Sequence, residues 1–141
     1  MSGKGSDWDR VDNLTSLPHK ILEAASKAGI DETEKERSAS YLHLDHSLVV
    51  SKVNEEFKGQ IELMDTLEAL EKYDWLSDLR FSLVDKDKDE YTKVAQNPSG
   101  GYFIRILPGA KVTFPLQSCL MITQNGVEQK VHNIIICEEG S

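Results

Sequence analysis

Three runs of strand-forming residues near the C-terminus constrain the fold of this chain more than any other feature. They span residues 101–109, 111–117 and 132–141, with the turn pairs Pro108-Gly109 and Asn125-Gly126 between them. The last run contains Ile134-Ile-Ile-Cys137, which predicts a strand buried on both faces. Such a strand needs neighbours on both sides, and the four residues that follow it cannot supply them. We therefore expect a sheet that is interrupted at Ser141.

The length, composition and net charge of the sequence exclude several classes of protein. A length of 141 residues suits one domain, or one small domain with part of another, and 39% hydrophobic residues suffice for a core. The net charge of −8 disfavours nucleic acid or an anionic membrane as a partner. No apolar stretch approaches the roughly 18 residues of a membrane span. The N-terminus lacks the apolar core of a signal peptide, so the expected location is the cytoplasm.

The chain divides into three segments by composition. We expect a flexible tail over residues 1–16, an N-terminal α/β region over 17–96 and a β-rich segment over 97–141. The second boundary falls where helix formers give way to strand formers. Apolar spacing in the middle region predicts three helices and two strands: helices over 18–28, over 65–83 with a break near Asp74, and over 87–95, and strands over 41–53 and 61–63.

The β-rich segment predicts four strands, over 102–107, 111–116, 118–123 and 129–137. Asn125-Gly126 is the best hairpin signal in the chain and predicts that the last two strands pair. The fold class is therefore expected to be α+β. The even spacing of the strands is typical of a stacked or coiled β architecture.

The two cysteines, Cys119 and Cys137, both lie within apolar strand candidates. In a chain without an export signal, this placement indicates reduced, buried thiols. The alternative is a sulfur carrier or a metal ligand, for which a CxxC pair or a nearby pair of histidines is missing.

Histidines provide the other weak candidates for a metal site. His43-Leu-Asp-His46 places His43 and Asp45 on one face of a strand and His46 on the other, so a three-residue site needs a bulge. A structural pairing of His43 with Asp45 is the preferred interpretation. His132 precedes the apolar strand that Glu138 and Glu139 follow, and water or backbone partners explain these groups equally well.

Motifs of a self-contained active site are missing from the sequence. Asp85, Asp87 and Asp89 fit the first positions of an EF-hand loop, but Glu90 and Gln96 occupy the positions that require Gly and Glu. Neither a Walker A loop nor a Gly-x-Ser-x-Gly elbow is present. We therefore predict no catalytic residue, no bound cofactor and no enzymatic activity.

The segment Gly101-Tyr-Phe-Ile-Arg-Ile-Leu-Pro-Gly-Ala-Lys-Val-Thr-Phe-Pro-Leu-Gln117 resembles the opening of the core region in the SufB/SufD family of iron–sulfur cluster assembly proteins. Ile135-Ile-Cys-Glu-Glu-Gly-Ser141 is similar to the "I-I-x-x-E-G-S" strand ending of that family. Upstream, Tyr41-Leu-His-Leu-Asp-His46 and Ala69-Leu-Glu-Lys-Tyr-Asp-Trp-Leu76 resemble the shorter archaeal-type members. The resemblance covers roughly residues 29–141.

This resemblance implies a subunit of a scaffold with a right-handed parallel β-helix, whose first coil or coils would begin within residues 97–141. It implies an N-terminal fragment of a longer protein that carries an iron–sulfur cluster. The implied partners are a SufC-type ABC ATPase and a second SufB/SufD-like subunit, bound through regions outside this chain. The reactive cysteine, glutamate and histidine positions of the family have no match here, so none is transferred to Cys119, Cys137, His43 or His132.

Two other functions fit the residues. One is a free-standing α+β binding module whose short sheet closes into a small barrel or sandwich. The other is a cupin-like metal-binding protein, which requires His43, His46 and His132 to converge.

Overall fold

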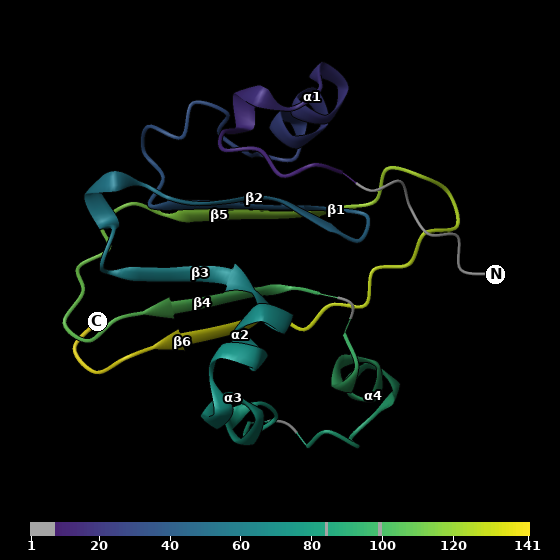
Figure 1. Cartoon of the computed structure of the whole chain (residues 1–141), viewed down its shortest axis with the longest axis vertical. Helices are drawn as coiled ribbons and strands as arrows, with labels where there is room; N and C mark the ends of the chain where they lie inside the picture. The colour runs from purple at the N-terminus through teal and green to yellow at the C-terminus, as the bar shows by residue number, and fades with distance from the viewer. Residues whose placement is uncertain (1–7, 84, 99) are drawn as a thin grey trace.

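The computed structural model describes residues 8–83, 85–98 and 100–141 and contains two stacked three-stranded sheets with helices on their outer faces (Figure 1). The predicted α+β class is confirmed. The described elements are, in chain order, a 3₁₀ turn Leu14–Ser16, α1 (His19–Lys27), β1 (Ala39–Leu44), β2 (Ser47–Val53), a 3₁₀ turn Glu55–Phe57, β3 (Ile61–Asp65), α2 (Thr66–Lys72), α3 (Asp74–Leu79), α4 (Glu90–Gln96), β4 (Tyr102–Ile106), β5 (Leu116–Met121) and β6 (Ile134–Cys137).

The first sheet, sheet A, has the strand order β2-β1-β5. Strands β1 and β2 form an antiparallel hairpin, and β5 adds parallel to β1 with Leu116 opposite Ala39. The prediction of one continuous strand over 41–53 was wrong because the chain reverses at Asp45 and His46. Asp45 adopts a left-handed φ of 52°, which Asp tolerates better than most residues.

The second sheet, sheet B, has the strand order β3-β4-β6. Strand β3 is antiparallel to β4, and β6 is parallel to β4. The helices α2, α3 and α4 lie between β3 and β4 in the chain. The predicted break in the long helix is confirmed at Tyr73, which leaves helical geometry with φ −120° and ψ 104°. The side chain of Asp65 caps α2 by accepting a hydrogen bond from the Leu67 amide.

Each sheet buries its outer face against helices. Sheet A packs Leu42, Leu44 and Val50 against α1 and the N-terminal segment. Sheet B packs Met64 and Phe103 against Ala69 of α2 and Leu76 of α3. The core is therefore divided into two layers, and the space between the sheets contains polar as well as apolar side chains.

The C-terminal strands differ from the prediction in three ways. Strands β5 and β6 lie in different sheets, so Asn125-Gly126 forms a turn but no hairpin. Residues 111–115 lie outside any strand. Strand β6 is partly buried on one face only: Ile134 and Ile136 pack toward Phe103, whereas Ile135 is 61% exposed. The continuous apolar run was misleading because only the face of β6 that carries Ile134 and Ile136 packs against the cluster around Phe103.

Both sheets combine strands from the two sides of the expected boundary at residue 97. Of the expected N-terminal tail, residues 1–7 lie outside the described residues, and Trp8, Val11 and Leu14 pack against sheet A. None of the helices that the structure describes has both the length and the apolar character needed to cross a membrane.

Candidate functional site: a polar network between the sheets

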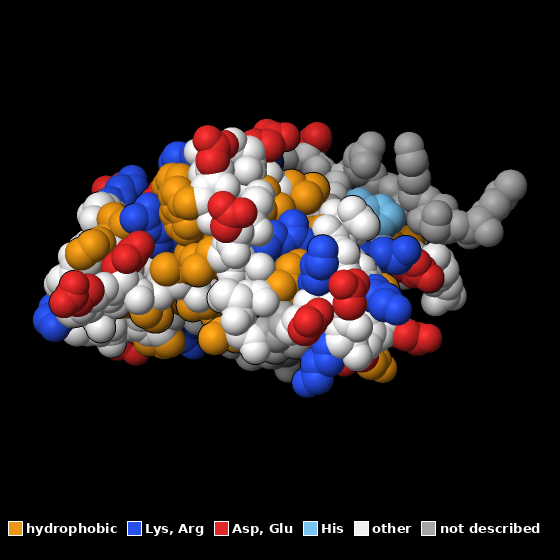
Figure 2. Space-filling model, turned by 90° about the horizontal axis from the view of Figure 1, so that it is seen from below, with side chains coloured by type: hydrophobic (Ala, Val, Ile, Leu, Met, Phe, Trp, Pro, Cys, Tyr) orange, Lys and Arg blue, Asp and Glu red, His pale blue; other side chains and the backbone are white. Residues whose placement is uncertain are grey.

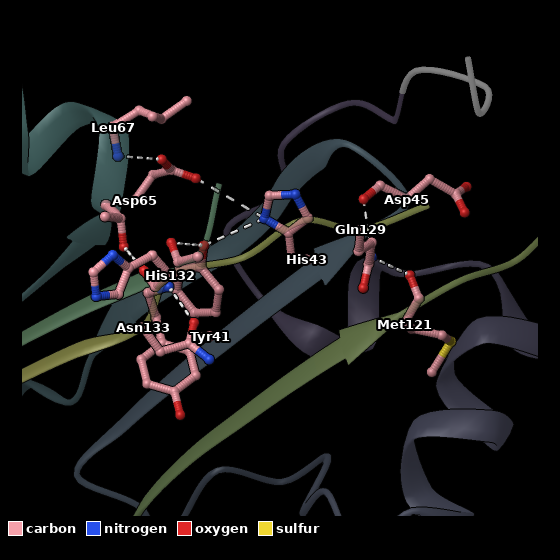
Figure 3. Close-up of polar contacts among 12 residues, drawn as sticks. Tyr41, His43, Asp45, Asp65, Leu67, Met121, Gln129, His132 and Asn133 are labelled. Carbon is pink, nitrogen blue, oxygen red and sulfur yellow. Dashed lines mark hydrogen bonds and ion pairs between the residues drawn. The ribbon is translucent and has the colours of Figure 1, made fainter. Parts of the chain in front are cut away.

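A connected polar group lies between the two sheets, where β1 faces the start of β4 (Figure 3). Tyr41 and His43 alternate along β1 and point toward sheet B. The Tyr41 hydroxyl donates to the Gly101 carbonyl at 2.7 Å, and His43 Nδ1 lies 3.3 Å from the Tyr41 oxygen. Asp65 Oδ2 lies 4.0 Å from His43 Nδ1. We call Tyr41, His43, Asp65 and Gly101 the interlayer network.

Glycines allow the backbone to approach this network closely. A Cβ atom on Gly100 would lie 2.8 Å from His43 Cε1, and one on Gly101 would lie 2.5 Å from the His132 carbonyl oxygen. Gly101 also adopts a φ of +136°, which L side chains rarely adopt. Its carbonyl accepts a second hydrogen bond from the Thr66 amide at 3.0 Å. The Gly100–Gly101 pair therefore joins β1, the start of α2 and the segment before β6.

Burial keeps the two rings of the network neutral. Burial, with the nearby negative charge of Asp65, raises the pKa of the Tyr41 phenol far above its usual value. Burial lowers the pKa of His43, and the carboxylate of Asp65 opposes this effect only in part. Because the Tyr41 proton goes to Gly101, the neutral imidazole can donate its Nδ1 proton to the Tyr41 oxygen. This arrangement links the sheets through two neutral rings.

The lowered pKa of His43 makes stability depend on pH. As the pH falls, the unfolded chain takes up a proton near the ordinary histidine pKa of 6.5, before the folded chain does. The free energy of unfolding should therefore be highest above that value and fall as the pH drops below it. Urea melts between about pH 7.5 and pH 5 should show this slope, and His43→Gln should flatten it. An equal slope in His43→Gln and in the unsubstituted protein would contradict the assignment.

A second polar cluster surrounds Asp45 at the β1–β2 turn. Its carboxylate accepts hydrogen bonds from the Thr123 amide at 2.8 Å, the Thr123 hydroxyl at 2.6 Å and Trp8 Nε1 at 3.0 Å. The side-chain amide of Gln129 donates to the backbone carbonyl of Asp45 at 2.9 Å (Figure 3). Burial alone would raise the pKa of Asp45, but the hydrogen bonds from Thr123 and Trp8 hold it below its usual value. Through these hydrogen bonds, Asp45 connects the N-terminal segment and the loop after β5 to the β1–β2 turn.

The predicted pairing of His43 with Asp45 was wrong, because these residues belong to separate clusters. The three histidines also have different surroundings: His43 lies between the sheets, His46 contacts the Glu128 carbonyl at 2.7 Å, and His132 Nδ1 contacts the Ala95 carbonyl at 3.2 Å. Within residues 8–83, 85–98 and 100–141, no three His, Cys, Asp or Glu side chains are grouped so that they could hold a metal ion.

The cysteines lie on different sheets. Cys119 on β5 is half-buried against the core of sheet A, and burial raises the pKa of its thiol. The prediction of two buried thiols was therefore wrong for Cys137, which is exposed on β6, and holds in part for the half-buried Cys119. The difference arises because Cys137 lies on the same face of β6 as the exposed Ile135, opposite to the face that packs beside Phe103.

Sequence reasoning missed an ion-pair cluster around Arg105 in the middle of β4. Its guanidinium donates to Glu62 on β3 and to Glu138 after β6, each at 2.9 Å, and lies 5.5 Å from the ring of Trp75. Tyr73 donates a hydrogen bond to Glu62. In the sequence, the only indication of this cluster was the single arginine within the apolar run Tyr102-Phe-Ile-Arg-Ile106. Its partners could not be identified because they are distant in the sequence.

Comparison with known proteins finds homologues that share one description. No family model matches the chain. An iron–sulfur cluster assembly SufBD family protein of Methanothermobacter thermautotrophicus is 36% identical over 143 residues, which cover 98% of this chain and 34% of that protein. A protein of the same description from Archaeoglobus fulgidus is 41% identical over 120 residues, 84% of this chain and 31% of that protein. This chain is a homologue of the SufBD family. A Mycobacterium tuberculosis SufBD family protein is 27% identical over 98% of the chain.

The SufBD match has two consequences for the site. It includes all six strands, since it covers 98% of the chain, and thus both sheets of the interlayer network. The chain spans about a third of the length of the curated SufBD relatives it matches. The interlayer network and the Asp45 cluster therefore lie within the part of the chain that matches these relatives.

Proposed function

We propose that this chain is a structural part of a SufBD-type scaffold subunit for iron–sulfur cluster assembly and that these 141 residues are themselves non-catalytic. The observation that carries the proposal is the match over 98% of the chain to relatives described as iron–sulfur cluster assembly SufBD family proteins. The chemistry of the two clusters supports the structural part of the proposal. Tyr41, His43 and Asp45 are occupied by hydrogen bonds that connect segments of the fold.

The strand topology supports a β-helix as the architecture of the scaffold. Strands β4, β5 and β6 alternate between sheet B, sheet A and sheet B, and β6 returns parallel to β4 (Figure 1). Ile134 pairs with Phe103, 31 residues earlier, which corresponds to one turn of a coil. Parallel crossovers of this kind are almost always right-handed. We propose that β4, β5 and β6 form the first coil of a right-handed parallel β-helix.

The cluster and the partners belong, in this proposal, to sequence outside the matched third. A SufC-type ATPase and a second SufBD-like subunit would act with the longer protein, and an iron–sulfur cluster would be its cargo. The placement of the thiols supports this division. Cys119 is half-buried on sheet A beside α1, whereas Cys137 is exposed on sheet B.

A gene deletion in the native host tests both parts of the proposal. Loss of the gene that encodes this chain should lower the activity of an iron–sulfur enzyme such as aconitase, while malate dehydrogenase, which has no cluster, keeps its activity. Re-expression should restore aconitase, and Cys119→Ser and Cys137→Ser should restore it equally well. Unchanged aconitase activity in the deletion strain would contradict the assembly role. Failure of either cysteine variant would contradict only the non-catalytic assignment.

A further inference from the structure

A hollow of about 650 Å³ lies where α3, α4 and β6 meet, on the outer side of sheet B. Much of its wall is apolar and comes from Leu79, Leu83, Ala95, Ile134 and Ile136. Figure 2 views the molecule from the side of α3 and α4 and shows hydrophobic side chains gathered on this face, with Lys and Arg side chains beside them. The volume is in the range of pockets that hold small organic molecules.

Arg80 places a positive charge at the edge of this apolar wall. Its Nη2 donates to the carbonyls of Ala95 and Gln96, at 2.8 and 3.0 Å, and so caps the end of α4. Its Nε is buried and has no hydrogen-bond partner among the described residues. Within residues 8–83, 85–98 and 100–141, no carboxylate forms an ion pair with Arg80. Arg80 is partly buried without an anionic partner, and a bound anion would offset the cost of its partial desolvation.

Phe81 lines the hollow in a strained backbone conformation. Its φ of 65° is unusual for a bulky side chain, and such outliers are concentrated at ligand-binding and active sites. The Phe81 ring lies 5.0 Å from the Arg80 guanidinium carbon and 4.8 Å from the His132 ring. Burial, and then the positive charge of Arg80, lower the pKa of His132. The neutral imidazole therefore extends the apolar surface, and Arg80 supplies the charge.

A second hollow of about 260 Å³ adjoins the first. Ser77, Lys86 and Gln96 line it, and Arg80 and Phe81 line both hollows. An apolar hollow is thus next to one that bears two cations, with Arg80 at their border. We propose that the two hollows together bind a small organic anion, with its aromatic or branched aliphatic body on the Ile134–Ile136 wall and its carboxylate, sulfonate or phosphate beside the guanidinium of Arg80, which lines both hollows. This site is independent of the proposed scaffold function.

Two fluorescent probes with the same apolar body test the site. 8-Anilinonaphthalene-1-sulfonate carries an anionic group, and N-phenyl-1-naphthylamine is its uncharged counterpart. Titration of the folded 141-residue protein should give at least tenfold tighter binding of the sulfonate. Arg80→Met keeps the apolar stem and should abolish the preference, whereas Lys27→Met, which removes an exposed cation on α1, should preserve it. Equal binding of the two probes, or absence of binding, would overturn the proposal.

A second variant keeps the test decisive if Arg80→Met fails to fold, since Arg80 also caps α4. Tyr91 lines the larger hollow and is 87% exposed, so Tyr91→Glu adds a carboxylate without disturbing the core. It should weaken sulfonate binding at least threefold and leave the neutral probe unaffected. Leu67→Glu adds the same charge on α2 away from the hollow. If the two variants weaken sulfonate binding equally, the effect comes from overall charge, and the proposal of a site at these hollows is wrong.

Discussion

Gly101→Ala should lower the free energy of unfolding by about 3–5 kcal/mol, a large loss for a single substitution. The added Cβ would lie 2.5 Å from the His132 carbonyl oxygen and 2.9 Å from its carbonyl carbon, so one of two backbone segments must move. The φ of +136° adds backbone strain. Movement of Gly101 would also disturb the carbonyl that accepts hydrogen bonds from Tyr41 and Thr66. Urea denaturation followed by circular dichroism measures the loss.

Gly109→Ala is the matched control for this change. Gly109 also has a positive φ, +71°, but no atom lies within 4 Å of the Cβ that alanine would add. Gly109→Ala should therefore lower the free energy of unfolding only through backbone strain, by about 1 kcal/mol. If Gly101→Ala costs no more than Gly109→Ala, the close approach between Gly101 and His132 contributes nothing to stability.

Asp45→Ala is expected to cost about 3 kcal/mol or more. The carboxylate is fully buried, and its removal leaves the Thr123 amide and the Trp8 indole N–H without an acceptor. Alanine is also less favourable than aspartate at a left-handed φ of 52°. The fluorescence of Trp8 should report a loosened N-terminal segment in the folded variant. An unchanged Trp8 spectrum, recorded with Trp75 replaced by phenylalanine, together with full stability would contradict the role given to Asp45.

Asp45→Asn separates the charge of this residue from its shape. Asparagine tolerates the left-handed turn and keeps one acceptor, so the loss should be smaller than with alanine. Because the folded pKa of Asp45 lies below its unfolded value, the carboxylate stabilises the protein above the unfolded pKa, and this contribution is lost as the pH falls through the folded pKa. Acid denaturation between about pH 5 and pH 2 should consequently be less steep in Asp45→Asn.

Local signals in the sequence predicted the helical part of the fold well. Pro18 and Gly29 delimit α1, Asp65 caps α2, and the helix breaks at Tyr73, next to the predicted position. These features depend on residues within one or two turns of each other, so spacing and capping preferences identify them. The same applies to β3 and β4, whose apolar residues lie between clear turn signals.

Long-range pairing was the part that local patterns could not predict. Asn125-Gly126 fits a hairpin, yet β5 pairs with β1 and β6 pairs with β4, because parallel partners are distant in the sequence. For the same reason the carboxylate near His43 is Asp65 rather than Asp45. Arg105 has partners on β3, on α3 and after β6, none of which a periodic pattern identifies.

The position of α2, α3 and α4 between two paired strands has a consequence for the entropy of folding. Asp65 lies opposite Tyr102 at the end of the β3–β4 ladder, so the helical segment is a loop whose ends are closed by sheet B. The entropic cost of closing a loop increases only with the logarithm of its length, by about 0.6 kcal/mol for each doubling. A lengthened or shortened turn between α3 and α4 should therefore change the free energy of unfolding little. Sheet A closes a longer loop, since its hydrogen-bonded Ser40 and Gln117 are 77 residues apart, and by the same logarithmic law this larger span adds only a small further cost.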